Sequence, residues 1–198
     1  MDSQTFEMWL AHADLYSSKH TDFDDSKTLK VLLENPISIG KVVKLLVDVA
    51  EDGEKALSTK AARLHIALAE SQGLAQDVMQ LAWLETRHDP TTIFKILSKG
   101  DKDFLTKRPK SAIEWLKYNE LVNEWSRQQG GIKRSLSKEE IADLLFRGRS
   151  FDESMVFIQK FLSAEDPKLM ALAHQLREIL SNSVSNAHKA KKLKAKKR

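Results

Sequence analysis

The sequence predicts an all-α fold from three observations: few turn residues, frequent helix-capping signals and helical spacing of apolar side chains. The 198 residues include seven glycines and four prolines, which leaves few positions for tight turns. The capping-box pattern S-x-x-E pairs Ser111 with Glu114, Ser137 with Glu140, and Ser150 with Glu153. Asp89-Pro90 and Asp166-Pro167 each fit an Asp cap followed by Pro at the first helical position.

Apolar residues between these signals recur every three or four positions, as on one face of a helix. The clearest stripe contains Val42, Val43, Leu46, Val49 and Ala50. No segment shows strand alternation with hairpin residues. The predicted helices cover residues 3–16, 26–34, 39–52, 54–71, 74–87, 90–98, 110–127, 138–147, 151–162 and 167–186.

Composition excludes several classes of protein. The chain has no cysteine, which excludes a disulfide scaffold, a thiolate metal site and a cysteine nucleophile. It has no run of about 18 apolar residues, so we expect no membrane-spanning helix. No apolar segment follows Met1, so we expect either a cytoplasmic protein or a chain that begins after a removed leader.

The net charge of +4 comes from a short C-terminal tail. This segment, 189–198, has seven basic residues and no acidic ones, and the rest of the chain has 25 basic against 28 acidic residues. The body is therefore near −3, which does not support a generally basic nucleic-acid-binding face. The basic residues of the tail are Lys189, Lys191, Lys192, Lys194, Lys196, Lys197 and Arg198.

An internal repeat with an offset of 112 residues relates two parts of the chain. The first copy contains Leu29, Leu32, Leu33, Ser38, Ala61, Leu64 and Leu68, which correspond to Ile141, Leu144, Leu145, Ser150, Ala173, Leu176 and Leu180. Each copy is a short helix, a turn and two longer helices. A small helical unit of this kind has to stack on its neighbours to bury its apolar face.

Residues 79–125, between the copies, carry a dense pattern of aromatic residues and prolines. Trp83-Leu84 lies on one predicted helix, Pro90 starts the next with Phe94 and Leu97, and Pro109 precedes a helix with Trp115-Leu116-Lys117-Tyr118. This pattern resembles the WY domain of oomycete RxLR effectors, as found in Phytophthora. The flanking copies resemble the L units that join WY domains into LWY arrays.

The resemblance implies a fold of tandem small helical bundles, WY-like and L-like, stacked into an elongated array. The expected organisation is an N-terminal helix and loop (1–25), an L-type unit (26–73), a WY-type bundle (74–128), a second L-type unit (129–186) and a basic tail (187–198). Trp83, Phe94, Leu97, Trp115 and Tyr118 are then the structural WY core and not a binding site. Stacked aromatic rings stabilise such a core by roughly 0.5–1.5 kcal/mol beyond their burial.

The sequence carries no catalytic or metal-binding motif. G-x-S-x-G, Walker A, G-x-G-x-x-G and HExxH are all absent, and the six histidines have no ligand spacing. The cluster of Asp22, Asp24 and Asp25 does not fit an EF-hand, because Lys27 and Leu33 stand where Gly and Glu are required. We interpret the cluster as a solvated cap for the helix near Ser26. We expect a non-enzymatic protein without a cofactor or metal.

The function implied by the resemblance is that of a secreted virulence effector. Such a protein enters plant cells, binds a host protein as a helical adaptor and suppresses immunity. The R-x-L-R motif is missing, and Arg63-Leu-His-Ile does not match it, so secretion is implied by the domain alone. The sequence does not specify the host target, the binding surface or the oligomeric state.

The tail adds an expected partner and location. Lys191-Lys192-Leu193-Lys194 fits K-K-x-K, which predicts binding to an importin and location in the host nucleus or nucleolus. The alternatives are nonspecific binding to a polyanion and no role at all. The second function hypothesis is an RNA-binding or nucleolar protein, such as a suppressor of host RNA silencing, in which the tail supplies the affinity. A third is a helical-repeat scaffold in an ordinary cell.

Overall fold

The computed structural model describes residues 2–34, 38–71, 76–101, 107–129, 135–163, 167 and 170–182. All regular structure in these ranges is helical, which confirms the predicted all-α class. Within the same ranges, no helix has the length and apolar character that a membrane span requires. The chain divides into two compact units, Met1–Ser135 and Leu136–Arg198, and the stacking of small bundles into an array stays a prediction.

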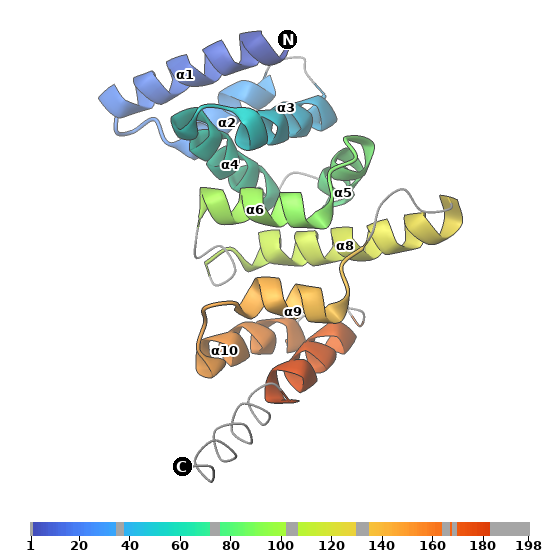
Figure 1. The fold of residues 1–198 in the computed structure, drawn as a ribbon. Coiled ribbons are helices and arrows are strands. Elements are labelled where there is room, and N and C mark those ends of the chain that lie inside the picture. Colours follow the sequence, from blue (N-terminus) through green and yellow to red (C-terminus); the bar gives the residue numbers. More distant parts are fainter. Residues whose placement is uncertain are drawn as a thin grey trace, which may run out of the picture. The chain divides into compact units, whose positions relative to one another are not determined.

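The first unit is built around one central helix. Its helices are α1 (Ser3–Lys19), α2 (Asp25–Glu34), α3 (Ile39–Asp52), α4 (Lys55–Glu70), α5 (Gln76–Glu85), α6 (Pro90–Gly100) and α8 (Pro109–Gln129). Helix α4 packs against α1, α2, α3, α6 and α8. Figure 1 shows it between α2 and α6. Because α3 also packs against α5 and α6, the helices of 26–73 and those of 74–128 share one core.

Local sequence explains the packing of α3 and α6 on α4. The Ser38 side chain accepts a hydrogen bond from the Lys41 amide and starts α3, whose predicted apolar stripe is entirely buried. Helix α6 ends at Gly100, where an added Cβ would lie 2.8 Å from the backbone of Ala62 in α4. Glycine is therefore required at this close approach of the two helices.

The second unit repeats the local pattern of the first. It contains α9 (Lys138–Phe146), α10 (Phe151–Leu162) and a helix over residues 170–182. Both predicted capping boxes, at Ser137 and at Ser150, are present with reciprocal hydrogen bonds. Ser38 and Ser150, which the repeat aligns, are both N-caps of the second helix in their copy. The repeat thus coincides with equivalent helix starts.

The predicted capping box at Ser111 is wrong. Helix α8 begins two residues earlier, at Pro109, and the Ser111 amide and hydroxyl both donate to Glu70 Oε1 of α4, at 2.8 and 2.7 Å. Glu114 instead accepts a hydrogen bond from Gln80 of α5 at 2.6 Å. A carboxylate from another helix thus satisfies the first turn of α8, which no local pattern could reveal.

The interpretation of the Asp22, Asp24 and Asp25 cluster as a solvated cap is right for one residue and wrong for another. Asp24 accepts from the Lys27 amide at 2.9 Å and so caps α2. Asp25 instead forms ion pairs with Lys60 and Arg63 of α4, at 2.8 and 3.0 Å. It therefore links α2 to α4.

Candidate functional site: aromatic core and interhelical groove

The five aromatic and aliphatic residues of the expected WY core are all buried in the first unit. The rings of Trp83 in α5 and Tyr118 in α8 meet edge to face, with centroids 5.2 Å apart. The rings of Phe94 in α6 and Trp115 in α8 lie 4.9 Å apart. Leu97 is fully buried in the same helix as Phe94. These contacts join α5, α6 and α8 into one bundle.

Every polar atom of the three large rings has a partner within this core. Trp115 Nε1 donates to the carbonyl oxygen of Pro90 at 2.7 Å. Tyr118 Oη donates to the carbonyl oxygen of His88, and the carbonyl oxygen of Trp83 lies 3.1 Å away. Burial raises the pKa of Tyr118, so the hydroxyl stays protonated. The hydrogen-bonding atoms of the three rings are therefore used within the core, and none is left for a ligand.

His65 of α4 ties the aromatic bundle to the preceding helices. It is fully buried, and its Nε2 accepts a hydrogen bond from Trp83 Nε1 at 3.0 Å, with the two rings nearly parallel. Burial lowers the pKa of His65 to about 3, and the charge of nearby His88 acts in the same direction. An imidazole that accepts from an indole N–H must be neutral at that nitrogen. No spacing pattern indicates this pair in the sequence, because the two residues are 18 positions apart.

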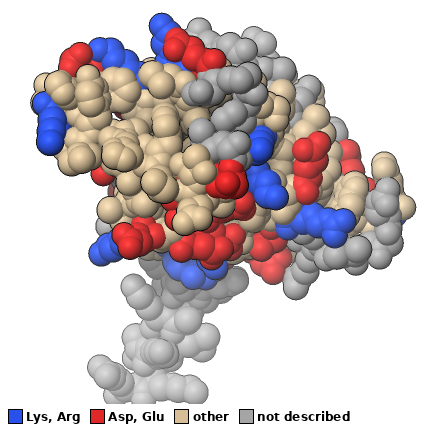
Figure 2. All heavy atoms as spheres, turned by 90° about the horizontal axis from the view of Figure 1, so that it is seen from above, with Lys and Arg blue, Asp and Glu red and all other residues tan. Residues whose placement is uncertain are grey.

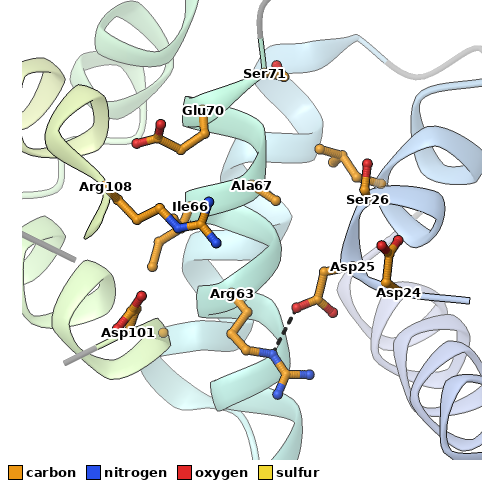
Figure 3. Close-up of a pocket in the computed structure, with 12 residues that line it drawn as sticks. Asp24, Asp25, Ser26, Arg63, Ile66, Ala67, Glu70, Ser71, Asp101 and Arg108 are labelled. Carbon is orange, nitrogen blue, oxygen red and sulfur yellow. Dashed lines mark ion pairs between the residues drawn. The ribbon is translucent and has the colours of Figure 1, made fainter. Parts of the chain in front are cut away.

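An open groove of about 490 Å³ lies where α2 and α4 meet the end of α6 and the start of α8. Figure 3 shows the side chains of Asp25, Arg63, Asp101 and Arg108 around it. Its floor includes Ile66 and Ala67 of α4. The groove therefore joins the segment expected to be an L-type unit to the segment expected to be the WY bundle.

Two of the four carboxylates that line the groove form contacts between helices. Asp25 pairs with Lys60 and Arg63, and Glu70 accepts two hydrogen bonds from Ser111. The guanidinium of Arg63 binds Asp25 through Nε at 3.0 Å (Figure 3). Arg108 is exposed and has no ion-pair partner in the described part of the chain. Four carboxylates, of Asp24, Asp25, Glu70 and Asp101, and two guanidinium groups, of Arg63 and Arg108, line the groove, so it offers both acceptors and donors of hydrogen bonds. An exposed guanidinium such as that of Arg108 suits a carboxylate.

The tail is the other predicted functional segment. The tail residues 189–198 lie outside the described residues, as does the whole segment 183–198. In the described part of the chain, no three His, Asp or Glu side chains gather as metal ligands do. His88 faces Glu51 and Asp48, at 3.5 and 3.9 Å, and belongs to the contact between α3 and the turn before α6.

Comparison with known proteins gives no relative for this chain. No family model, no curated protein and no solved structure matches it. The WY resemblance therefore rests on the sequence pattern between residues 79 and 125 and stays a prediction.

Sequence reasoning missed the groove because its residues come from four separate helices. One signal was present: Lys60 and Arg63 stand three apart on α4, next to buried Ala61, Ala62 and Leu64. Basic residues at that spacing share a helix face and indicate a carboxylate nearby.

Proposed function

We propose that this chain is a secreted pathogen virulence effector that acts in plant cells as a non-enzymatic helical adaptor. In this role it binds a host protein and suppresses immunity. The observation that carries the proposal is the paired aromatic core, in which Trp83 meets Tyr118 and Phe94 meets Trp115. These are the residues on which the resemblance to the WY domain depends. Because the polar atoms of this core already have hydrogen-bond partners inside it, the host protein has to bind at the surface.

The groove beside Arg63 and Arg108 is the proposed docking site for the host protein. Of its four carboxylates, Asp25 is held by Lys60 and Arg63, and Glu70 is held by Ser111. The side chains of Arg63 and Arg108 both line the groove, and both residues are exposed (Figure 3). Arginine binds carboxylates through two parallel hydrogen bonds, so an Asp or Glu side chain of the partner fits here. Ile66 and Ala67 supply an apolar floor beside that contact.

Affinity purification from plant cells tests this site. The wild-type chain should recover a specific plant protein, and Arg108→Glu should lose it, because a carboxylate would then face the partner's carboxylate. Lys95→Glu is the matched control, since Lys95 is exposed on α6 and does not line the groove. Equal recovery by both variants would rule out the groove, and recovery of no plant protein by the wild type would count against the adaptor.

The tail is proposed as a nuclear address, with RNA binding as the alternative role. Deletion of residues 189–198 should abolish nuclear accumulation and leave the host protein bound. If the function is RNA binding, the same deletion should abolish an RNA affinity that falls steeply with salt, because seven cations release several counterions. If the chain without residues 189–198 stays nuclear, the tail is not the nuclear-targeting signal.

A further inference from the structure

The loop between α1 and α2 presents a hydroxyl group that the fold does not use. Residues 20–24 lie outside both helices, since α1 ends at Lys19 and α2 begins at Asp25. Thr21 and Asp22 form a turn within this loop, and both are exposed. In the described part of the chain, the Thr21 side chain forms no hydrogen bond. Its hydroxyl is therefore accessible to another protein.

Aromatic contacts hold this loop in one shape. The Tyr16 ring stacks on the His20 ring with centroids 4.2 Å apart, and it meets the Phe23 ring edge to face at 5.0 Å. The Phe23 amide donates to the carbonyl oxygen of His20 at 2.9 Å. Thr21 and Asp22 therefore lie between two anchored residues. An exposed loop on a rigid scaffold is a usual place for contacts with other proteins.

Aspartates follow Thr21 at the first, third and fourth positions after it, as Asp22, Asp24 and Asp25. An acidic residue at the third position also follows several other hydroxyl residues: Thr86, Ser98, Ser111, Ser137, Ser150 and Ser163. None of these has an acidic residue at the first position. The hydroxyl of each also forms a hydrogen bond within the chain. Thr21 therefore differs from them both in its sequence and in its free hydroxyl.

We propose that Thr21 is phosphorylated by a protein kinase that recognises acidic residues on the C-terminal side of its acceptor. Kinases select their substrates through charge patterns of this kind. The Asp22 side chain is 80% exposed and Asp24 is exposed as well, so both carboxylates are accessible to basic residues of the kinase. In the transfer, the bond from the γ-phosphorus of ATP to its bridging oxygen breaks and a bond to Thr21 Oγ1 forms. ADP leaves, and the hydroxyl proton passes to the catalytic base of the kinase.

Arg63 of α4 is the expected partner of the phosphate. Thr21 lines a hollow of about 370 Å³ together with Lys60 and Arg63. Lys60 is only 3% exposed and is held by Asp25 at 2.8 Å. Arg63 is 45% exposed, and the contact with Asp25 uses its Nε. A phosphate carries a charge of about −1.5 to −2 at pH 7 and binds a guanidinium through paired hydrogen bonds.

The charges around the loop are mixed. Asp22 and Asp24 oppose an added phosphate, whereas the ammonium group of Lys27 lies 3.3 Å from Asp22 and Arg63 lines the same hollow. Figure 2, which views the molecule from the side of α1, shows basic side chains next to acidic ones. The contact with Arg63 therefore decides how well the modified loop accommodates the phosphate.

Phosphorylation would also change the groove described above, because Arg63 lines both the hollow and the groove. A phosphate bound to Arg63 takes up hydrogen bonds that a partner's carboxylate would otherwise receive, so docking should weaken. This consequence rests on the proposed function. The modification itself does not, since it is measured on the purified chain without a host protein.

Incubation of the full chain with ATP, Mg²⁺ and a purified casein kinase of the acid-directed type tests the site. Peptide mapping by mass spectrometry should find a phosphoryl group on Thr21, and Thr21→Val should remove it. Asp22→Asn and Asp24→Asn should each lower the initial rate of transfer several-fold. Asparagine is as good an N-cap as aspartate, so Asp24→Asn removes the charge and keeps the start of α2. Asp52→Asn is the matched control, because Asp52 is exposed at the end of α3, outside the loop.

Phosphorus NMR of the modified chain tests the contact with Arg63. The midpoint of the phosphate titration should lie at higher pH in Arg63→Gln than in the wild type, because a nearby cation favours the dianion. Arg87→Gln, at an exposed position in the turn after α5, should leave the midpoint unchanged.

Circular dichroism should show that all variants are folded. A chain that stays unmodified at Thr21, or that is modified only at other hydroxyls, overturns the proposal. Equal rates for Asp22→Asn, Asp24→Asn and Asp52→Asn overturn recognition through the acidic residues. Equal titration midpoints for the wild type and Arg63→Gln overturn the contact with Arg63.

Discussion

Acid should destabilise the first unit through His65. Its pKa is about 3 in the folded chain and about 6.5 when unfolded, so the unfolded chain binds more protons between these values. The contribution of His65 to stability is therefore complete above pH 6.5 and is lost as the pH falls toward 3. The physical cause is burial, together with the hydrogen bond from Trp83 Nε1, which requires a neutral acceptor.

The magnitude follows from the two pKa values. Relative to pH 8, protonation of His65 in the unfolded chain should lower the free energy of unfolding by about 2 kcal/mol at pH 5 and about 3 kcal/mol at pH 4. Carboxylates add their own loss at low pH, so a matched variant is needed to isolate the histidine. His65→Gln keeps an oxygen that can accept from Trp83 and removes the titration. It should be less stable at pH 8 and show a flatter decline with acid.

Urea unfolding at several pH values, followed by tryptophan fluorescence, measures this difference. All four tryptophans lie in Met1–Ser135, so the signal reports the first unit. His174→Gln, at an exposed position in the second unit, should leave the pH profile of the first unit unchanged. Parallel profiles for the wild type and His65→Gln between pH 8 and pH 5 would refute the reasoning.

Three further substitutions test the packing. Trp83→Ala should lower the free energy of unfolding by about 3–5 kcal/mol, because a fully buried indole leaves a cavity, and an unchanged melting temperature would contradict the aromatic core. Gly100→Ala should lower the free energy of unfolding by about 1–3 kcal/mol, because the added methyl group forces α6 away from Ala62. An unchanged melting temperature would show that α6 and α4 do not approach each other so closely. Ser150→Ala should lower the free energy of unfolding of the second unit by about 1 kcal/mol, because it removes the N-cap of α10. Thermal unfolding followed by circular dichroism would detect the loss. Equal stability would mean that Glu153 or water replaces the cap.

The fold class and most helix starts could be predicted because they depend on short-range chemistry. Ser137, Ser150 and Asp89 each satisfy an amide within three residues, and such hydrogen bonds leave a local pattern in the sequence. The burial of Trp83, Trp115 and Tyr118 likewise follows from their helical spacing and size.

The sequence by itself determined where helices form and which of their faces are apolar, since both depend on neighbours within one or two turns. The tertiary structure decided which polar groups meet. Glu70 caps α8 in place of a local side chain, and Asp25 binds Lys60 and Arg63 across two helices. His65 receives the Trp83 indole N–H only because α4 and α5 are brought together. Such contacts join residues far apart in the chain, and their geometry is fixed only once the helices have packed.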